Sequence, residues 1–337
     1  GYVGRGNLGD EAIAASLAAG LAKRGFAPRI LSAAPAFTRT TLGVPAHGRM
    51  VGVLPGILQV DAVVSGGGGL LQDRTSARSL TYYLGVLRLA RRLGRSTVVY
   101  GQSIGPLSER GRHQVARALA QTACFVRDAP SATLLAAAGK ASTRVADAAL
   151  ALDPSDTVVQ GVQGGVLLIP RGDVEGATAA LRFAARQLAA AGVPVAVLAL
   201  DRRMDARAAA QVADAVGLKP LDIADPRIAM AAASAAKLVV SVRLHGLIFA
   251  ARTGTAHVGV GYDPKVRGFA EQTQAPVLHV PVAEDALWRV VRTRLAAVEA
   301  DDGATAEARH ALAERLASDA EAGLDALADA LERAIRR

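Results

Sequence analysis

The stretch Lys237-Leu-Val-Val-Ser-Val-Arg-Leu-His-Gly246 decides the fold class of this chain. Its apolar run from Leu238 to Val242 predicts a buried strand, and residues 247–251 predict the helix that follows. Arg243 and His245 therefore lie where a strand ends and a helix begins, which is where α/β proteins place ligands. Because helix N-termini also attract anions, we interpret this corner as an anion-binding, acid/base site.

Strand-like and helix-like segments alternate along the chain, which predicts βα units and parallel sheets flanked by helices. The predicted strands are 29–31, 60–64, 96–100, 124–126, 166–169, 194–200, 238–242 and 256–260, and the predicted helices are 10–23, 80–92, 110–122, 131–138, 177–191 and 207–216. A turn-rich break at 153–165 separates a predicted N-terminal domain, 1–153, from a C-terminal domain, 164–300, and a helical tail, 301–337. We expect a strand before the opening glycine-rich turn, so the first strand of the N-terminal sheet is expected to be missing from this numbering.

Composition restricts the classes of partner. Apolar residues make up 51% of the 337 residues and aromatic residues only 4%, which favours helices packed on sheets. The net charge of +9 admits an anionic substrate or an anionic membrane surface. The basic residues form no stripe interleaved with aromatic residues, so we expect no nucleic-acid partner. The single cysteine, Cys124, excludes an internal disulfide framework, and we identify no signal peptide or membrane-spanning segment.

Unusual polar residues come directly after the predicted strands. Because the carboxyl ends of parallel strands share one edge of a sheet, we expect these side chains to line a cleft between two facing sheets. They are Ser65 with its glycines, Gln102, Arg127, Arg171, Arg243 with His245, and Asp263 with Lys265.

Two glycine-rich segments are candidate ligand loops. Four glycines, Gly66, Gly67, Gly68 and Gly69, follow Ser65, and their entropic cost favours close approach of the backbone to a substrate. The opening turn, 1–9, fits a dinucleotide fingerprint only loosely, and a tight turn that needs positive φ explains its glycines equally well.

Simple structural roles stay open for several of these residues. His245 has the alternative of a core histidine, Arg127 that of an ion pair with Asp128, and Arg171 that of a surface residue. No spacing of histidines or carboxylates indicates a metal site, and no cofactor is predicted.

Six motifs in one order resemble the polysaccharide pyruvyl transferases, most closely the CsaB type. They are Gly1-Tyr-x-Gly-x-Gly-Asn-x-Gly-Asp-Glu-Ala12, Ser65-Gly-Gly-Gly-Gly-Leu-Leu-Gln-Asp73, Gly101-Gln-Ser-Ile-Gly-Pro106, Val126-Arg-Asp128, Ser241-Val-Arg-Leu-His-Gly246 and Gly261-Tyr-Asp-Pro-Lys265. The resemblance implies two Rossmann-like domains facing across a cleft, as in the GT-B glycosyltransferases. It also implies transfer of a pyruvyl group from phosphoenolpyruvate, a co-substrate, to a sugar, with formation of a ketal and release of phosphate.

The resemblance further implies the cellular setting and the site residues. The acceptor is expected to be a lipid-linked precursor of a secondary cell-wall polymer that anchors S-layer proteins, and the enzyme is expected in the cytoplasm, peripheral to the inner membrane leaflet. No oligomeric state is indicated. Carried over by motif, Arg127, Arg243, His245 and Lys265 are expected to form the phosphoenolpyruvate site, with His245, Arg127 and Lys265 catalytic, and the N-terminal glycine loops are expected to face the acceptor. The expected substrate-binding residues are Arg243, Leu244, Ser65, Gly66, Gly67, Gly68, Gly69, Asn7, Asp10, Gln102 and Arg171.

The chemistry of phosphoenolpyruvate agrees with these residues, because its carboxylate and phosphate suit paired Arg and Lys side chains. We expect His245 to protonate the enol carbon. Three alternatives stay open: a nucleotide-sugar glycosyltransferase with the same fold, a non-catalytic anion- or glycan-binding protein, and, least favoured, a nicotinamide oxidoreductase.

Overall fold

The structure, a computed structural model, describes residues 1–74, 76–172, 174, 176–301 and 303–336. The chain divides into two compact units, each described here by itself. The first unit comprises Gly1–Arg5, Asp10–Ala151 and Ser318–Arg337, and the second comprises Gly6–Gly9 and Leu152–Ala317. None of the described helices is both long enough and apolar enough to cross a bilayer.

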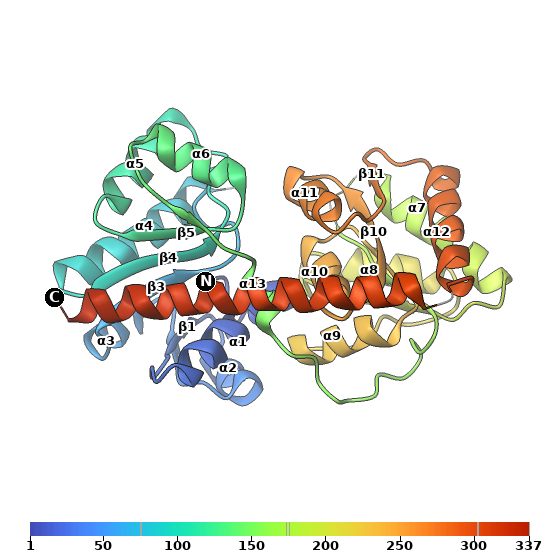
Figure 1. Cartoon of the computed structure of the whole chain (residues 1–337), viewed down its shortest axis with the longest axis horizontal. Helices are drawn as coiled ribbons and strands as arrows, with labels where there is room; N and C mark the ends of the chain where they lie inside the picture. Colours follow the sequence, from blue (N-terminus) through green and yellow to red (C-terminus); the bar gives the residue numbers. More distant parts are fainter. Residues whose placement is uncertain (75, 173, 175, 302, 337) are drawn as a thin grey trace. The chain divides into compact units, whose positions relative to one another are not determined.

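Parallel strands form the first unit's two sheets (Figure 1). A four-stranded sheet has the order β3-β4-β5-β6, built from β3 (Ala62–Gly66), β4 (Ser96–Gln102), β5 (Ala123–Val126) and β6 (Thr143–Arg144). A separate pair joins β1 (Ile30–Ser32) to β2 (Ala46–Gly48).

Helices cover the strands of the first unit. They are α1 (Leu8–Lys23), α2 (Pro35–Leu42), α3 (Val53–Leu58), α4 (Ala77–Arg92), α5 (Glu109–Leu119) and α6 (Ala129–Ala137), followed by the 3₁₀ turn η1 (Ala148–Ala151). One core packs apolar residues of α4, α5 and α6, such as Leu84, Leu119 and Leu135, against Val99 and Val126 of the sheet.

A single five-stranded parallel sheet forms the centre of the second unit. Its order is β11-β10-β9-β7-β8, with β7 (Val166–Ile169), β8 (Val195–Val197), β9 (Leu238–Ser241), β10 (Ala256–Gly261) and β11 (Val277–His279). Numbered within the unit, this is the doubly wound order 2-1-3-4-5. The chain therefore reverses its direction of winding between β7 and β9, and ligands of such sheets bind at the carboxyl ends of those two strands.

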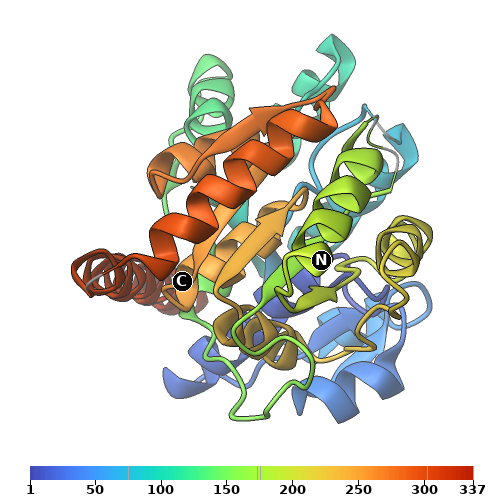
Figure 2. The same ribbon diagram turned by 90° about the vertical axis from the view of Figure 1, so that its right-hand side faces the viewer.

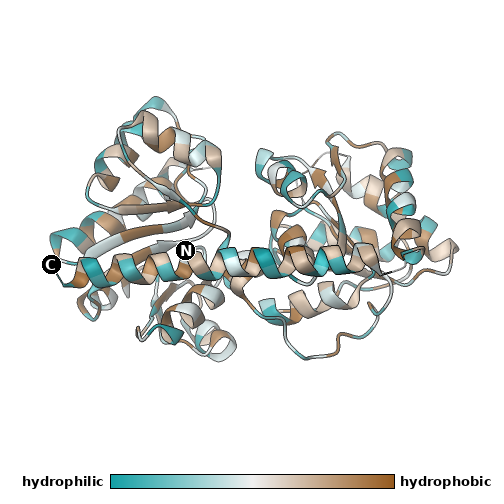
Figure 3. Ribbon diagram, viewed as in Figure 1, coloured by the Kyte–Doolittle hydropathy of each residue, from teal (hydrophilic) through white to brown (hydrophobic). Residues whose placement is uncertain are grey.

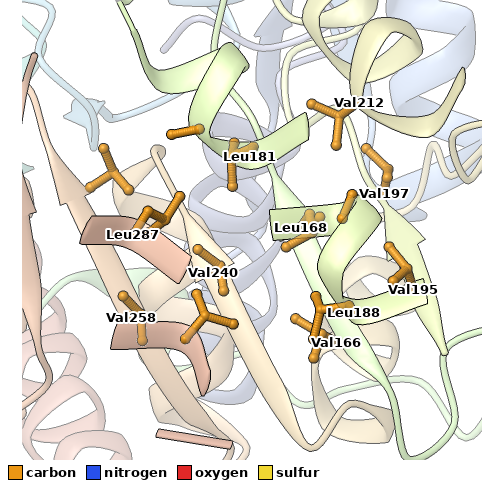
Figure 4. Packing of buried hydrophobic residues seen from close by; sticks show 14 of the residues in the cluster. Val166, Leu168, Leu181, Leu188, Val195, Val197, Val212, Val240, Val258 and Leu287 are labelled. Carbon is orange, nitrogen blue, oxygen red and sulfur yellow. The ribbon is translucent and has the colours of Figure 1, made fainter. Parts of the chain in front are cut away.

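Helices lie on both faces of the second unit's sheet. They are α7 (Ala177–Ala190), α8 (Ala206–Asp214), α9 (Pro226–Ala235), α10 (Leu244–Arg252), α11 (Pro264–Gln272) and α12 (Glu284–Glu299). Figure 2 shows α7 and α12 side by side over one face. There Leu181, Leu188 and Leu287 pack against Leu168 and Val240 of the strands (Figure 4).

The predicted elements match the observed ones within a few residues, and the tail forms one helix, α13 (Ala304–Ile335). Polar and apolar residues recur along α13, drawn teal and brown in Figure 3. Arg337, the last residue of the predicted tail, lies outside the described residues.

The two units differ from the predicted continuous ranges in two places. Gly6–Gly9 groups with the second unit, because the Leu8 N–H donates to the Leu200 carbonyl at 2.7 Å and Asn7 forms an antiparallel bridge with Asp201. The tail is divided after Ala317, so that each unit contains part of α13.

Candidate functional site

Polar residues gather at the carboxyl edge of the second unit's sheet. Arg171 follows β7, Arg243 follows β9, and Tyr262 and Lys265 follow β10, while Asp201 lies in the loop after β8. The first two residues flank the point where the winding direction reverses. The structure thus brings three predicted site residues, Arg171, Arg243 and Lys265, to one edge of one sheet.

Arg243 is fixed by a buried carboxylate. Its Nε and Nη2 donate to Asp205 at 2.8 and 2.5 Å, and the Asp205 side chain is fully buried. Asp205 also accepts from the backbone N–H groups of Gly172 and Asp201 at 3.1 and 3.0 Å. Burial lowers the pKa of Arg243, but the hydrogen bonds and charge of Asp205 outweigh it and leave the pKa above its ordinary value.

This pairing leaves one edge of the guanidinium for a ligand. Asp205 occupies the edge formed by Nε and Nη2, and no described residue accepts a hydrogen bond from Nη1 of Arg243. The Arg243 side chain keeps 14% exposure, so solvent or an anion reaches it. A planar guanidinium held on one edge is oriented in advance for a carboxylate or phosphate on the other.

The other two cations have close partners as well. Arg171 donates from Nη1 to the Tyr262 hydroxyl at 2.5 Å, and its guanidinium carbon lies 4.2 Å from the centre of the Tyr262 ring. Lys265 Nζ lies 3.6 Å from Asp263 Oδ2, and Asp263 caps α11 by accepting from the Lys265 N–H at 3.0 Å. Asp205 and Asp263 therefore partly neutralise Arg243 and Lys265, so the net positive charge at this edge is smaller than its number of Arg and Lys side chains.

His245 lies in the first turn of α10, and no side chain caps this helix. Its imidazole packs against the backbone of Gly9, because a Cβ added to Gly9 would lie 2.1 Å from Nδ1. Its predicted neighbour Leu244 is only 7% exposed. Only a residue without a side chain fits between His245 and the start of α1.

Asn7 ties the same segment to this edge. Its Oδ1 accepts from the Gly9 N–H at 3.0 Å, and its Nδ2 donates to Asp201 Oδ2 at 3.4 Å. Asn7 directly precedes α1 and caps its first turn through this bond. Asn7 thus belongs to the same unit as Arg243 and His245, rather than to the unit in which the sequence placed it.

Arg127 lies in the first unit, in an internal network. Its Nη1 donates to Asp147 at 2.6 Å and its Nε to the Ser103 hydroxyl at 2.8 Å, with 7% of its side chain exposed. The ion-pair alternative is right in kind but wrong in partner, because Asp128 instead caps α6 through the Ser131 N–H at 2.9 Å. A role for Arg127 at the donor stays a prediction.

Gln102 and Ser65 hold two strands of the first unit together. The Gln102 amide donates to the Ser65 hydroxyl at 2.7 Å and to the Ser65 carbonyl at 2.8 Å, and the Gln102 side chain is fully buried. This contact gives both residues a structural role inside the sheet.

Close packing of α1 explains three of the four glycines that follow Ser65. Added Cβ atoms at Gly66, Gly67 and Gly68 would lie 2.4, 2.1 and 2.9 Å from Leu17, Ile13 and Asp10, respectively. Gly69 differs, because an added Cβ there would meet nothing within 4 Å and the residue is exposed. The predicted ligand contact of this loop stays a prediction, and Gly69 is its most accessible member.

Sequence reasoning missed Asp205 and the contact of Gly9 with His245. Asp205 precedes a predicted helix and belongs to no recognisable motif. Its role comes from the contact with Arg243, 38 residues away, which no local pattern indicates. Among the described residues, no three His, Cys, Asp or Glu side chains come together as metal ligands.

A sequence profile of the family described as "Polysaccharide pyruvyl transferase" matches residues 7–264. The chain belongs to the polysaccharide pyruvyl transferase family. This pyruvyl transferase family match spans the edge residues from Asn7 to Asp263 and ends at Pro264, one residue before Lys265. No curated protein sequence matches the chain.

Solved structures share the fold of this pyruvyl transferase family member at low sequence identity. A glycosyltransferase from Rickettsia africae is 11% identical with a TM-score of 0.62, over 98% of this chain and 96% of that one. Anabaena HepE in complex with UDP-glucose is 14% identical with a TM-score of 0.62, over 96% and 95%. The S. aureus MnaA–UDP structure is 12% identical with a TM-score of 0.58, over 93% and 88%. The predicted GT-B-like α/β fold class is confirmed.

Proposed function

We propose that this transferase moves the pyruvyl group of phosphoenolpyruvate onto a sugar of a lipid-linked cell-wall polysaccharide precursor, forming a ketal and releasing phosphate. One observation carries the proposal. Arg171, Arg243, Lys265 and His245 share the carboxyl edge of one sheet, beside the reversal in its winding.

The donor has two anionic groups, and the edge offers complementary groups for both. The open edge of the Arg243 guanidinium suits bidentate binding of a carboxylate or a phosphate. Lys265 and the uncapped first turn of α10 attract the other anion, because the N-terminus of a helix carries partial positive charge. Arg171 is held beside them by Tyr262.

His245 supplies the proton in the proposed reaction. Proton transfer from its imidazole to C3 of phosphoenolpyruvate turns the methylene into a methyl group and makes C2 electrophilic. One sugar hydroxyl then bonds to C2 and loses its proton. The C2–O bond to phosphate breaks, hydrogen phosphate leaves, and a second hydroxyl closes the cyclic ketal as it gives up its own proton.

The direct test is mass spectrometry of candidate sugar acceptors after incubation with phosphoenolpyruvate, alongside measurement of released phosphate. The proposal expects the acceptor mass to increase by one pyruvyl ketal. It also expects one phosphate to be released for each acceptor that is modified. His245→Gln should abolish both signals, whereas the control His310→Gln, on α13, should keep them. Full turnover by His245→Gln would remove His245 from the mechanism.

The same assay tests the alternative of a nucleotide-sugar glycosyltransferase. We choose UDP-glucose as the nucleotide sugar because Anabaena HepE, which shares the fold, was solved with it. Replacing phosphoenolpyruvate by UDP-glucose should leave the acceptor mass unchanged. Transfer of glucose, or thermal stabilisation by UDP but not by phosphoenolpyruvate, would contradict the proposal. Stabilisation by phosphoenolpyruvate without any product would favour a non-catalytic binding protein.

A lipid-linked acceptor calls for contact with the anionic inner leaflet, and the first unit has a basic surface that suits this. A hollow on α4 and α5 is lined by Arg88, Arg110, His113 and Arg117, with Glu109 as its only acid. Each well-placed basic residue contributes about 1 kcal/mol to binding an anionic surface. Arg110→Glu with Arg117→Glu should weaken binding to phosphatidylserine vesicles in low salt, whereas Arg289→Glu on α12 should not; equal binding by all three proteins would contradict this contact.

A further inference from the structure

The segment between β2 and β3, which contains α3 (Figure 1), presents large apolar side chains to solvent. Met50 is 72% exposed, Val51 92%, Leu54 49% and Leu58 53%. These four residues, here called the apolar face, follow one another at the spacing of one side of a helix. Single exposed apolar side chains are common on protein surfaces, whereas a contiguous set of them marks an interaction site.

The other side of α3 is buried in the first unit. Ile57 is 2% exposed, and a Cβ added to Gly56 would lie 3.5 Å from Leu31 and 3.7 Å from His47. The whole sequence of α3, Val-Leu-Pro-Gly-Ile-Leu, is apolar. A helix of this kind needs apolar surroundings on every side, and the first unit supplies them on one side only.

A tight turn fixes the part of the apolar face that precedes α3. The Gly52 N–H donates to the Gly48 carbonyl at 2.9 Å, and a Cβ added to Gly52 would lie 2.5 Å from the same carbonyl oxygen. Met50 and Val51 lie within this turn. A hydrogen-bonded turn therefore holds both side chains out of the core.

The surroundings of the apolar face are basic. Residues 26–60 contain no aspartate or glutamate but contain the three arginines Arg29, Arg39 and Arg49. Arg39 donates to the Ala46 carbonyl at 3.1 Å, and Arg95 donates to the Leu58 carbonyl at 3.3 Å. Because a carbonyl carries no net charge, these contacts do not neutralise the two guanidinium groups. The charge of this surface therefore suits an anionic partner.

Arg49 and Arg95 mark the two ends of the apolar face. The guanidinium carbon of Arg49 lies 4.9 Å from the centre of the Tyr82 ring, and the Tyr82 hydroxyl donates to the Arg49 carbonyl. Arginine and tyrosine each combine an apolar body with a polar tip, which suits the boundary between lipid headgroups and acyl chains. An apolar centre with cationic ends thus matches the surface of an anionic bilayer.

A protein partner fits this surface less well. A stable protein interface buries about 800 Å² on each partner, contributed by roughly 20–30 residues. The apolar face has only four side chains. A bilayer sets no such minimum area, because binding strengthens with each apolar side chain that enters it and with attraction to anionic lipids.

We propose that the apolar face inserts into the headgroup region of an anionic bilayer, with Arg49 and Arg95 against lipid phosphates. Interfacial helices bury their apolar side about 5–10 Å deep in this way. The inference rests on the proposed contact with the inner leaflet for the identity of the membrane. It adds a part of that contact that resists salt, whereas the basic hollow on α4 and α5 supplies attraction that salt screens.

The test compares two double variants without charge changes by co-sedimentation with vesicles of phosphatidylserine and phosphatidylcholine in high salt. Val51→Ser with Leu54→Gln removes apolar surface from the face. Val158→Ser with Leu218→Gln makes the same changes in the second unit, where the two side chains are 69% and 42% exposed. The first variant should bind roughly ten-fold more weakly than the parent, and the second should bind as the parent does.

A second measurement locates the inserted residue. Val51→Cys and Val158→Cys each provide one reactive thiol for a dye whose emission depends on polarity. Cys124 does not compete, because it is buried and burial raises its pKa to about 11. With vesicles, the dye at position 51 should shift to shorter wavelength and be quenched by lipids brominated on their acyl chains, whereas the dye at position 158 should do neither.

Several outcomes would overturn the proposal. Equal vesicle binding by the two double variants would exclude insertion of the apolar face. Binding that depends on Arg110 and Arg117 and disappears in high salt would assign the contact to the basic hollow alone. Dimerisation without lipid that Val51→Ser with Leu54→Gln abolishes would assign the face to a second copy of the chain. These experiments contain neither phosphoenolpyruvate nor acceptor, so failure of the proposed reaction would leave their results unchanged.

Discussion

At the scale of single residues, the Arg243–Asp205 pair fixes the orientation of one guanidinium at the carboxyl edge of the second unit's sheet. Removing one member of a buried pair leaves an uncompensated charge, which costs about 3–5 kcal/mol. We expect Asp205→Asn to lower the free energy of unfolding by about that amount, because Arg243 is only 14% exposed. Urea denaturation measures this change.

A matched control comes from the same unit. The Arg202–Asp222 pair is exposed, so Asp222→Asn should change stability little. Asp205 is expected both to stabilise the fold and to orient Arg243 for the donor. Under conditions in which Asp205→Asn is still folded, phosphoenolpyruvate should therefore stabilise the variant less than it stabilises the parent. Undiminished stabilisation would show that Arg243 does not need Asp205 in order to bind the donor.

We predict that turnover depends on Gly9, because its lack of a side chain leaves room for the His245 imidazole. In Gly9→Ala the new Cβ would lie 2.1 Å from Nδ1, so the imidazole must move away from its position in the first turn of α10. We expect turnover to fall by at least ten-fold with the fold retained. In Gly268→Ala, on α11, the new Cβ meets nothing within 4 Å, so turnover should stay near the parent value. Equal turnover in both variants would contradict the placement of His245.

His257 makes the stability of the second unit depend on pH. Burial lowers the pKa of His257 from 6.5 to about 4, while its ring nitrogens bond the Thr255 carbonyl and the Thr273 hydroxyl at 3.0 and 2.8 Å. The unfolded chain binds the proton first as pH falls, so this contribution is complete above pH 6.5 and is lost between pH 6.5 and 4. The loss amounts to about 3 kcal/mol.

The measurement compares the pH dependence of unfolding in the parent and in His257→Gln. A glutamine can keep a hydrogen bond to Thr273 but does not titrate, so the variant should lose less stability than the parent from pH 7 to 4.5. Parallel pH profiles would show that folding does not lower the pKa of His257.

At the scale of elements, the pattern of apolar runs predicted the sheets well. The four residues of β7 are all fully buried, and their boundaries agree with those predicted. Buried parallel strands carry the strongest signal, because both of their faces must be apolar.

Elements whose sequences give no clear apolar pattern were not predicted. The helix α9 was not predicted, because its sequence Pro-Arg-Ile-Ala-Met-Ala-Ala-Ala-Ser-Ala is almost uniformly small and gives no clear period. The short strands β2 and β11 are three residues each, too short to show an alternation.

The sequence predicted which strand ends carry the candidate site residues, but it did not predict the contacts that those residues make. Arg171, Arg243 and Lys265 were found because each follows a strand, which is a local signal. The pairing of Arg243 with Asp205 joins residues far apart in sequence, and nothing local to either residue indicates it.

Gly323 lets α13 approach the first unit's sheet. A Cβ there would lie 2.6 Å from the Tyr100 hydroxyl oxygen and 3.3 Å from Val145, and Tyr100 is fully buried beside Phe125. We expect Gly323→Ala to lower the free energy of unfolding by about 1–3 kcal/mol, as overpacking does. Thermal denaturation provides the measurement.

Gly85→Ala serves as the control within the same unit. Gly85 lies inside α4, where an added Cβ meets nothing within 4 Å, so alanine should raise stability by up to about 1 kcal/mol. Opposite signs for the two substitutions would separate crowding from helix propensity. Two stabilising substitutions would mean that α13 yields to the extra methyl group.

At the scale of the whole molecule, each unit has its own core, and the proposed donor residues of the sheet edge belong to the second unit alone. Phosphoenolpyruvate at about 100 times its Kd should therefore stabilise that unit by about 2.7 kcal/mol. Hydrogen exchange measured by mass spectrometry should show slower exchange in β7, β9 and α10. Protection confined to β3 and β4 would move the donor site to the first unit.

The segment Gly6–Gly9 has a practical consequence for recombination between relatives. A chimera joined at a single crossover after Ala151 would inherit the partners of Asn7 and Gly9 from a different parent. The imidazole of one parent would then meet the amino-terminal segment of the other. Exchange of the two halves as modules therefore requires that residues 6–9 travel with the carboxyl-terminal half, or that both parents carry glycine at position 9.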